Sequence, residues 1–235
     1  MNFILFDGPR RDHLLPFTFT RPVSEIRVGI LTLRERWEAY LKVAVSSLTE
    51  DYLSIKYPVN IESENVFIDA SVLPSDDLLK AVKALNDGEV LKSGNLTIAY
   101  SNDSAKSDDE LASFKITEFT GELVQINNTW DIFDKNADIL QTDFDFITKG
   151  RKSQPISETN QLIHPERIFL EEGAKVEFSI LNATDGPIYL GKNAEIWEGS
   201  LVRGALALCN NAIIKMGGKL YGATTIGPYS KVCGE

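Results

Sequence analysis

The chain ends in a row of six-residue blocks: LGKNAE (residues 190–195), IWEGSL (196–201), VRGALA (202–207), LCNNAI (208–213), IKMGGK (214–219), LYGATT (220–225), IGPYSK (226–231) and the partial block VCGE (232–235). Every block begins with an aliphatic residue, and the pattern never slips. A period of six fits neither an α-helix nor an ordinary β-strand, and it is the hexapeptide repeat of a parallel β-helix. The repeat therefore predicts stacked triangular coils in the C-terminal part of the chain.

Two positions of each block have separate roles in such a coil. The aliphatic residue fills the interior, and a small side chain four residues later eases the corner. These small residues are Ala194, Ser200, Ala212, Gly218, Thr224 and Ser230, with Leu206 as the exception. A fainter copy occupies residues 170–180, and a two-residue change of phase near Gly186 and Pro187 separates the two copies. We therefore expect a β-helix over residues 161–235.

The repeat stops in the middle of a block, at Glu235. A solenoid needs a polar cap, because its last coil otherwise exposes apolar interior and unpaired strand edges. We therefore expect the natural protein to continue beyond Glu235 with further coils.

The first 160 residues follow a different pattern. Short apolar runs of strand length occupy residues 3–6, 66–69 and 96–100, and helical patterns occupy residues 31–48, 75–86 and the segment from residue 129. Strands that alternate with helices predict an α/β domain with a mainly parallel sheet. Ligands of such sheets bind at the carboxyl ends of the strands, so we expect the loop over residues 7–27 to carry the functional site.

Charge and composition exclude several classes of partner. The net charge is −10, and residues 101–145 alone hold eleven acidic and three basic side chains. Nucleic-acid binding instead requires a basic face. No window approaches the roughly 18 apolar residues of a membrane span, and the N-terminus lacks the basic lead of a signal peptide. Two cysteines make no disulfide framework, so we expect a cytoplasmic protein that contacts neither nucleic acid nor membrane.

The arginines are concentrated near the N-terminus. Six of the nine fall within the first 36 residues, and two of those six belong to the predicted helix over residues 31–48. The other four, Arg10, Arg11, Arg21 and Arg27, lie in loop-like sequence, where ligand contacts gather. Because the planar guanidinium suits bidentate recognition of phosphate, these four residues predict an anion-binding site.

Residues 14–22 read LLPFTFTRP. They are similar to the LxPLTxTRPK motif of sugar nucleotidyltransferases, which follows the glycine-rich nucleotide loop of that family. With SEIRVGIL at residues 24–31 and the hexapeptide repeat, the whole chain resembles a divergent branch of the bifunctional N-acetylglucosamine-1-phosphate uridyltransferase and glucosamine-1-phosphate acetyltransferase enzymes. The resemblance implies a Rossmann-like α/β nucleotidyltransferase domain over residues 1–160 and a left-handed β-helix over residues 161–235.

The resemblance also implies an activity and a set of site residues. Enzymes of this kind join a nucleoside triphosphate to a sugar 1-phosphate with Mg²⁺, as in the synthesis of UDP-N-acetylglucosamine or dTDP-glucose, and the chemistry is charge neutralisation at phosphorus. Mapped onto this chain, catalysis is expected from Arg10, Arg11 and Arg27, binding of the nucleotide phosphates from Asp7, Gly8 and Arg21, and binding of the metal from Asp69.

The chain departs from the family pattern at three places. The loop after residue 7 has one glycine instead of three, and Val23 stands where the family has the lysine that holds the sugar phosphate. Arg27 is the stand-in that we expect for this lysine, because it is close in the sequence. The metal-binding aspartate of the family aligns with Ser71, and Asp69 precedes that position by two residues.

The acetyltransferase half of the family uses a histidine beside acetyl-CoA at a trimer interface. This chain has two histidines, His13 and His164, and neither lies in the regular repeat. We therefore expect no acyl transfer from this chain, and a need for acetyl-CoA only in a longer protein whose histidine follows Glu235. The flat faces of the β-helix imply a homotrimer.

Two other functions are compatible with the same sequence. One is a catalytically degenerate domain that binds a nucleotide sugar or regulates a partner. The other is a hexapeptide acyltransferase whose active site lies beyond this chain and whose α/β domain recognises the substrate.

Overall fold

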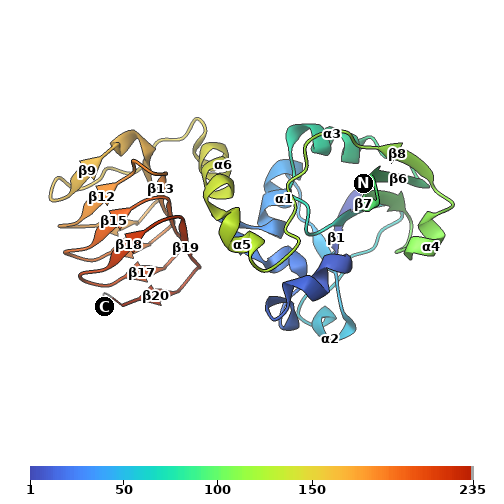
Figure 1. Ribbon diagram of the computed structural model, residues 1–235, viewed down its shortest axis with the longest axis horizontal. Coiled ribbons are helices and arrows are strands. Elements are labelled where there is room, and N and C mark those ends of the chain that lie inside the picture. Colours follow the sequence, from blue (N-terminus) through green and yellow to red (C-terminus); the bar gives the residue numbers. More distant parts are fainter. Residues whose placement is uncertain (234–235) are drawn as a thin grey trace. The chain divides into compact units, whose positions relative to one another are not determined.

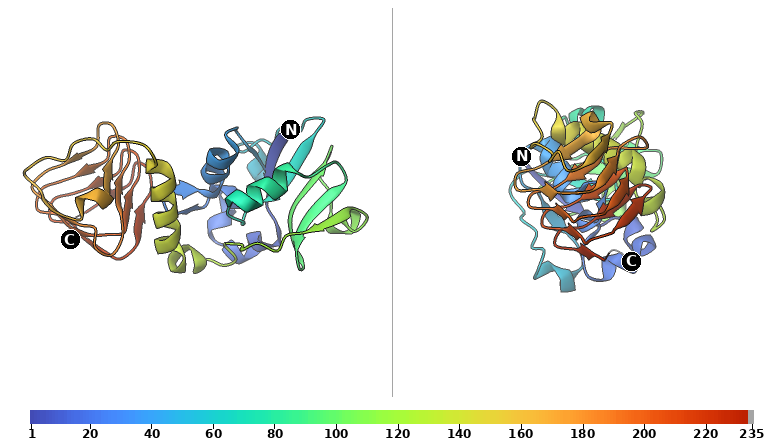
Figure 2. Two further views of the ribbon diagram at one scale, coloured as in Figure 1. Left: turned by 90° about the horizontal axis from the view of Figure 1, so that it is seen from above. Right: turned by 90° about the vertical axis from the view of Figure 1, so that its left-hand side faces the viewer.

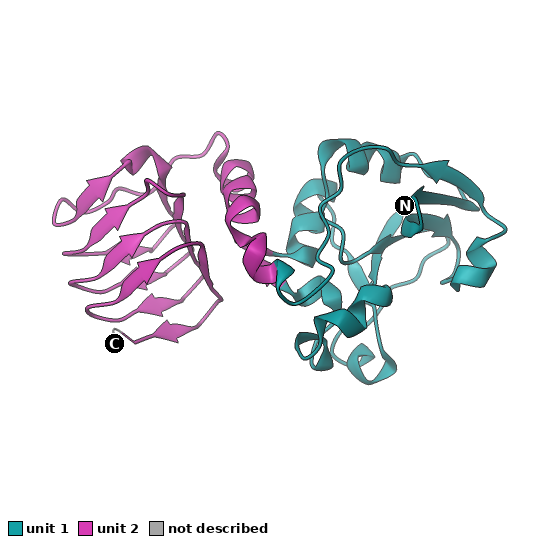
Figure 3. Cartoon of the chain, viewed as in Figure 1, with its two compact units in different colours: residues 1–26, 32–131 teal, residues 27–31, 132–235 magenta. Residues whose placement is uncertain are grey.

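The computed structural model describes residues 1–233, which form two compact units (Figure 3). Unit 1 comprises Met1–Ile26 and Thr32–Asp131, and unit 2 comprises Arg27–Leu31 together with the chain from Ile132 onward. The last partial block is described only as far as Cys233, so the predicted continuation of the repeat lies outside the described residues. Within residues 1–233, the helices are too short or too polar to cross a bilayer.

Unit 1 is built on a six-stranded sheet with the order β4-β1-β5-β7-β6-β8 (Figure 1). The strands are β1 (Asn2–Phe6), β4 (Ser46–Leu48), β5 (Asn65–Asp69), β6 (Glu89–Ser93), β7 (Leu96–Asn102) and β8 (Lys115–Glu118). β1 is parallel to β4 and β5, and β6 is parallel to β8. β7 is antiparallel to both of its neighbours, so the α/β fold is confirmed with a mixed sheet. The short strands β6 and β8 were not predicted.

Helical segments connect these strands. They are η1 (Pro9–Leu14), η2 (Phe17–Phe19), η3 (Val23–Glu25), α1 (Leu33–Leu41), α2 (Asp51–Ser54), α3 (Asp76–Lys83) and α4 (Asp108–Leu111). The helix predicted over residues 31–48 was too long. It starts after the Thr32 capping box and ends at Leu41, because Lys42 adopts a left-handed conformation at φ 62°. Residues 46–48 form β4 instead.

The core of unit 1 follows from strand alternation. Ile4, Phe67, Val90 and Tyr100 lie on one face of the sheet and pack together with Leu111 of α4. Leu5, Ile68, Leu91 and Ala99 occupy the alternate positions of the same strands and are equally buried. Trp37 of α1 is also fully buried and donates its indole N–H to the Val72 carbonyl at 2.9 Å. The end of β5 is thereby attached to α1.

Unit 2 contains three four-stranded sheets, all parallel, consistent with a left-handed β-helix (Figure 2). The first sheet is β10 (Ile168–Leu170), β13 (Ile188–Leu190), β16 (Leu206–Leu208) and β19 (Thr224–Ile226). The second is β11 (Lys175–Val176), β14 (Glu195–Ile196), β17 (Ile213–Ile214) and β20 (Lys231–Val232). The third is β9 (Gln161–Ile163), β12 (Ile180–Asn182), β15 (Leu201–Arg203) and β18 (Lys219–Tyr221). Pro165–Arg167 forms η4 between β9 and β10.

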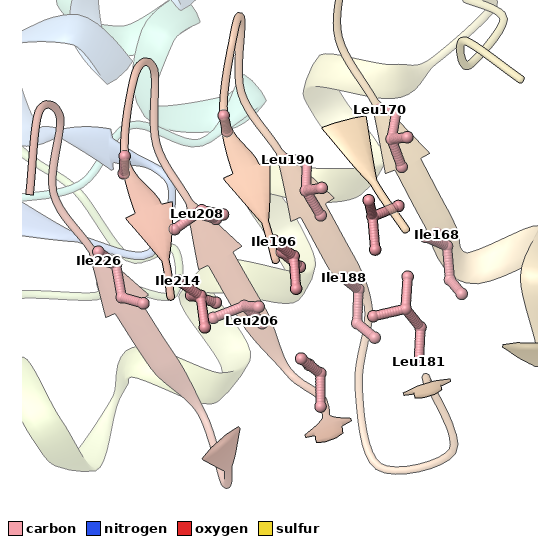
Figure 4. Packing of buried hydrophobic residues seen from close by; sticks show 14 of the residues in the cluster. Ile168, Leu170, Leu181, Ile188, Leu190, Ile196, Leu206, Leu208, Ile214 and Ile226 are labelled. Carbon is pink, nitrogen blue, oxygen red and sulfur yellow. The ribbon is translucent and has the colours of Figure 1, made fainter. Parts of the chain in front are cut away.

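The hexad pattern explains the interior of these coils (Figure 4). Leu190, Ile196, Leu208 and Ile214 each begin a block and are at most 2% exposed. Leu206 is 1% exposed and registers with Ile188 of β13, so this exception to the small-residue position is a second interior residue. The early coils are confirmed too. Ile168 pairs with Ile188, twenty positions later, whereas Ile188 pairs with Leu206, eighteen positions later. The extra two residues fall at the predicted change of phase.

The outer face of the first sheet is covered within unit 2. α5 (Asp131–Asp134) leads into α6 (Asn136–Thr148), which lies along the coils in Figure 1. Leu140 and Phe144 of α6 pack on Phe169, Tyr189 and the small residues of the same face. An all-apolar strand such as IYL at residues 188–190 is thereby buried on both faces.

The short segment Arg27–Leu31 is held by α6 and the β-helix. It belongs to a two-stranded sheet of β2 (Arg27–Val28) and β3 (Leu31–Thr32). The Asp143 carboxylate accepts the Ile30 N–H at 2.8 Å, and the Asn136 side chain accepts the Gly29 N–H at 2.8 Å. These contacts place residues 27–31 in unit 2, although their neighbours on both sides belong to unit 1.

Candidate functional site

Two carboxylates lie at the carboxyl ends of neighbouring parallel strands in unit 1. Asp69 is the last residue of β5 and registers with Phe6, the last residue of β1. Asp7 follows directly on Phe6. This edge of an α/β sheet is where ligands bind, as expected for the loop that starts at residue 7.

Asp7 is saturated with hydrogen bonds. Its Oδ1 accepts the Val23 N–H at 2.8 Å, and its Oδ2 accepts Arg11 Nη1 at 2.8 Å and the Thr49 hydroxyl at 2.6 Å. Burial raises the pKa of Asp7 above its ordinary value, and the hydrogen bonds from Thr49, Val23 and Arg11 oppose that rise. Asp7 therefore ties three segments of the chain together and presents no unused oxygen.

Asp69 differs because one of its oxygens is unused. Its Oδ1 accepts the Ser71 N–H at 2.8 Å and the Ser71 hydroxyl at 2.6 Å. Its Oδ2 is buried and has no hydrogen-bond partner within residues 1–233. Burial raises the pKa of the Asp69 carboxyl, and the nearby charge of Asp7 adds to the rise, whereas the Ser71 hydrogen bonds and the Arg10 charge oppose it. Buried polar atoms without partners are rare and often belong to functional sites.

Gly8 leaves the space beside this oxygen. A Cβ placed on Gly8 would come within 2.7 Å of Asp69 Oδ2. The backbone at Gly8 is extended, with φ −82°, so glycine is required here by the close approach and not by backbone strain. A side chain at this position would therefore collide with the Asp69 carboxylate.

Replacing Gly8 with alanine should reduce ligand binding at this edge without unfolding the protein. The added methyl group fills the space beside Asp69 Oδ2, and small-to-large changes at packed positions cost about 1–3 kcal/mol. The measurement is the affinity for Mg²⁺ and a nucleoside triphosphate, alongside the thermal melting curve. Gly88→Ala serves as a control, because a Cβ there would meet nothing within 4 Å, although its φ of +74° adds strain. Unchanged affinity in Gly8→Ala would show that the ligand does not use this space.

The two adjacent arginines of η1 have different environments. Arg11 is buried and donates to Asp7, to the Thr18 carbonyl at 2.7 Å and to the Tyr52 hydroxyl at 2.8 Å. Arg10 is half-buried, and its buried Nε has no hydrogen-bond partner among the residues described. Arg10 is thus the arginine with an unused donor beside Asp69, whereas the donors of Arg11 hold the loop.

The other residues expected in the site lie on other segments of the chain. Arg21 is exposed on the loop of unit 1. Arg27 belongs to unit 2, where its guanidinium donates to the Ile30 carbonyl. Val23 is 1% exposed, so its side chain is part of the core while its N–H binds Asp7.

One residue of this edge was not predicted from the sequence. Asn127 follows Ile126, whose N–H donates to the Ser71 carbonyl at 2.9 Å, and its Oδ1 is a second buried oxygen without a partner in the described part of the chain. Its N–H donates to Asp131 Oδ2 at 2.7 Å, which fixes the turn. The pair of adjacent asparagines in INNTW at residues 126–130 is the sequence feature that could have indicated this residue.

These features define a class of protein: an α/β domain with a buried carboxylate and an arginine at a ligand-binding sheet edge, followed by a β-helix. Among known families, the profile of one described as sugar nucleotidyl transferase matches residues 3–152, and the chain belongs to that family. The match covers the predicted site residues and most of the chain, and it indicates transferase activity on a nucleoside triphosphate and a sugar phosphate, typically with Mg²⁺. No curated protein matches the chain.

Proposed function

We propose that this protein is a sugar-1-phosphate nucleotidyltransferase. A phosphate oxygen of the sugar 1-phosphate attacks the α-phosphorus of the nucleoside triphosphate, the bond to the β-phosphate breaks, and pyrophosphate leaves. The observation that carries the proposal is the presence of two buried atoms without partners in the described residues, Asp69 Oδ2 and Arg10 Nε, with the Arg10 charge close enough to lower the pKa of Asp69. Both atoms are costly to bury without partners, so a ligand that supplies those partners would bind favourably.

Arg10 would bind the phosphate oxygens on which negative charge accumulates. Phosphoryl transfer needs positioning and neutralisation of charge more than covalent chemistry. A guanidinium donates several hydrogen bonds to phosphate and stays charged at any physiological pH. Gly8 supports this role, because its lack of a side chain lets a phosphate approach the loop backbone.

The residues at this edge fit a magnesium ion. Mg²⁺ is usually bound through one or two protein oxygens together with the phosphates of the substrate. Asp69 Oδ2 and Asn127 Oδ1 are oxygens of the preferred kind that have no hydrogen-bond partner among the described residues. Residues 1–233 contain no group of three or more His, Cys, Asp or Glu side chains placed to hold a metal. When bound, the ion would neutralise phosphate charge and help to hold the triphosphate.

Arg11 and Asp7 would act as positioning residues of the site. Their ion pair at 2.8 Å, with the Thr18 carbonyl on the far side of Arg11, fixes the course of residues 7–18. This role differs from the catalytic role expected for Arg11. Phosphate contacts of Arg21 and Arg27, the homotrimer and the absence of acyl transfer by this chain stay predictions.

The direct test is release of pyrophosphate with Mg²⁺ across four nucleoside triphosphates and a panel of sugar 1-phosphates. We expect turnover with one pair of the UDP-N-acetylglucosamine or dTDP-glucose type. Arg10→Ala should slow that turnover about 10- to 100-fold, which corresponds to the loss of charged hydrogen bonds worth about 1.5–3 kcal/mol. Arg203→Ala is the matched control, since this arginine is exposed on the β-helix and pairs with Asp185.

Arg27→Ala belongs in the same assay, because it tests the proposed stand-in for the lysine absent at position 23. Absence of turnover across the panel, from protein that is folded, would contradict the proposed function and favour a domain that only binds its ligand. Equal rates for Arg10→Ala and the wild type would remove Arg10 from the mechanism.

A further inference from the structure

A pocket of about 260 Å³ opens beside the candidate site in unit 1. Its lining residues come from the ends of β1, β4 and β7 and from the segment before α4, and they are Phe6, Asp7, Leu48, Thr49, Glu50, Tyr100 and Lys106. Drug-sized ligands occupy roughly 300–1,000 Å³. This pocket therefore has room for a single ring with its substituents, and not for a whole nucleotide sugar.

One wall of the pocket is apolar. Tyr100 stacks on Phe67 with ring centroids 4.8 Å apart and also contacts Phe6 at 5.8 Å. Its hydroxyl accepts the Lys106 N–H at 3.1 Å, and burial raises the pKa of Tyr100 to about 12, so the ring stays neutral. Phe6 and Leu48 give the pocket an apolar wall that suits the C–H face of a sugar ring, and Tyr100, which is 2% exposed, packs against Phe6.

The rim of the pocket carries both signs of charge. The Lys106 side chain is 24% exposed, and its ammonium lies 3.8 Å from Glu110, too far for a hydrogen bond. Across the rim, the half-exposed Glu50 carboxylate lies 3.5 Å from Arg11 Nε and keeps capacity to accept hydrogen bonds. An anionic group and several hydroxyl groups on one ring would satisfy this rim.

We propose that this pocket binds the sugar 1-phosphate, with Lys106 on its phosphate and Glu50 on its hydroxyl groups. The proposal rests on the proposed function, and it adds the location of the second substrate. An uncharged nucleoside would offer the Lys106 ammonium no anion in addition to Glu110. Moreover, Asp7 lines the pocket and precedes Gly8, so a phosphate here lies next to the loop that binds the triphosphate, as the attack on phosphorus requires.

The test is calorimetric titration of the full chain with glucose 1-phosphate, N-acetylglucosamine 1-phosphate and other hexose 1-phosphates, and separately with Mg²⁺ and each nucleoside triphosphate. Lys106→Met keeps the backbone N–H that binds Tyr100 and removes the ammonium group with its charge and its hydrogen-bond donors. We expect it to weaken binding of the preferred sugar phosphate about 10- to 100-fold while leaving triphosphate binding unchanged. Lys80→Met is the matched control, since this lysine is exposed on α3.

Glu50→Gln adds an independent readout. It should weaken binding of the sugar phosphate but not of inorganic phosphate, because inorganic phosphate lacks the sugar hydroxyl groups that Glu50 would bind. The pocket assignment is overturned if no hexose 1-phosphate binds, if Lys106→Met binds the sugar phosphate as the wild type does, or if that variant loses the triphosphate instead.

The outcomes for this pocket and for the proposed function are distinguishable. Lys106-dependent binding of a sugar phosphate without any release of pyrophosphate would support the pocket and contradict the transferase. Release of pyrophosphate with an unchanged KM for the sugar phosphate in Lys106→Met would support the transferase and overturn the pocket.

Discussion

Asp69→Asn should abolish most nucleotidyl transfer while making the protein harder to unfold. Removing one preorganised charged group from a site of this kind costs about 10²- to 10³-fold in turnover. Asparagine keeps an oxygen for the two Ser71 hydrogen bonds at 2.6 and 2.8 Å. It also removes a buried charge whose Oδ2 has no partner in the described residues, and relief of such a cost commonly stabilises by about 0.5–2 kcal/mol.

The same substitution should change how stability depends on pH. Because burial raises the pKa of Asp69 above 3.8, the folded protein binds more protons than the unfolded chain between pH 3.8 and the folded pKa. The free energy of unfolding therefore falls as the pH rises through that window. Asp69→Asn should make the free energy of unfolding fall less steeply with pH. Asp7, whose pKa is also raised by burial, should contribute to the decrease that remains.

Turnover and thermal melting curves at pH 4 to 8 measure both effects. Asp87→Asn is the matched control, because Asp87 is exposed in the turn before β6. A variant that loses stability, or that keeps full turnover, would show that Asp69 is an ordinary structural carboxylate. The expected combination of lost activity and gained stability is characteristic of a residue retained for function.

Leu208→Ala should cause the largest loss of stability in unit 2. Leu208 is fully buried in the cluster of coil residues and begins one of the six-residue blocks. Leucine-to-alanine changes in cores cost about 2–5 kcal/mol, because the cavity that remains collapses only partly. At about 2–4 °C for each kcal/mol in a protein of this size, the melting temperature should fall by roughly 5 °C or more.

Leu201→Ala provides a matched leucine on the outer face of the same coils. Leu201 is 43% exposed, so its truncation should change stability by no more than about 0.5 kcal/mol. Circular dichroism during heating compares the two variants. Equal effects of the two substitutions would contradict the inward position of the block-initial residues.

The sequence predicts the part of the site that lies in the loop directly after β1. Asp7, Gly8 and Arg10 follow β1 within four residues, and the arginine in this loop indicates an anion site, whereas the roles of Asp7 and Gly8 were implied by the family resemblance. Asn127, Glu50 and Lys106 are not predictable in this way. They come from separate segments, and only the order of strands in the sheet brings β1 between β4 and β5. No local pattern encodes that order.

Arg10 and Arg11 also show that the sequence alone does not decide which residues are free to bind a ligand. Both have the residue type and position expected of a phosphate ligand, but Arg11 uses its donors on Asp7, Thr18 and Tyr52 while Arg10 keeps a buried donor unused. Which of two neighbours turns inward depends on the backbone of η1 and on partners up to 41 residues away.

Local pattern is sufficient to specify the β-helix, because each six-residue block repeats the same inward position and one coil pairs in register with the next. It also specifies the alternation of strands and helices in unit 1. Long-range contacts, in contrast, place β7 antiparallel to β5 and join residues 27–31 to unit 2 through Asp143 and Asn136. Periodic patterns record which side of an element is buried, whereas the choice of partner depends on hydrogen bonds and packing between residues far apart in the chain.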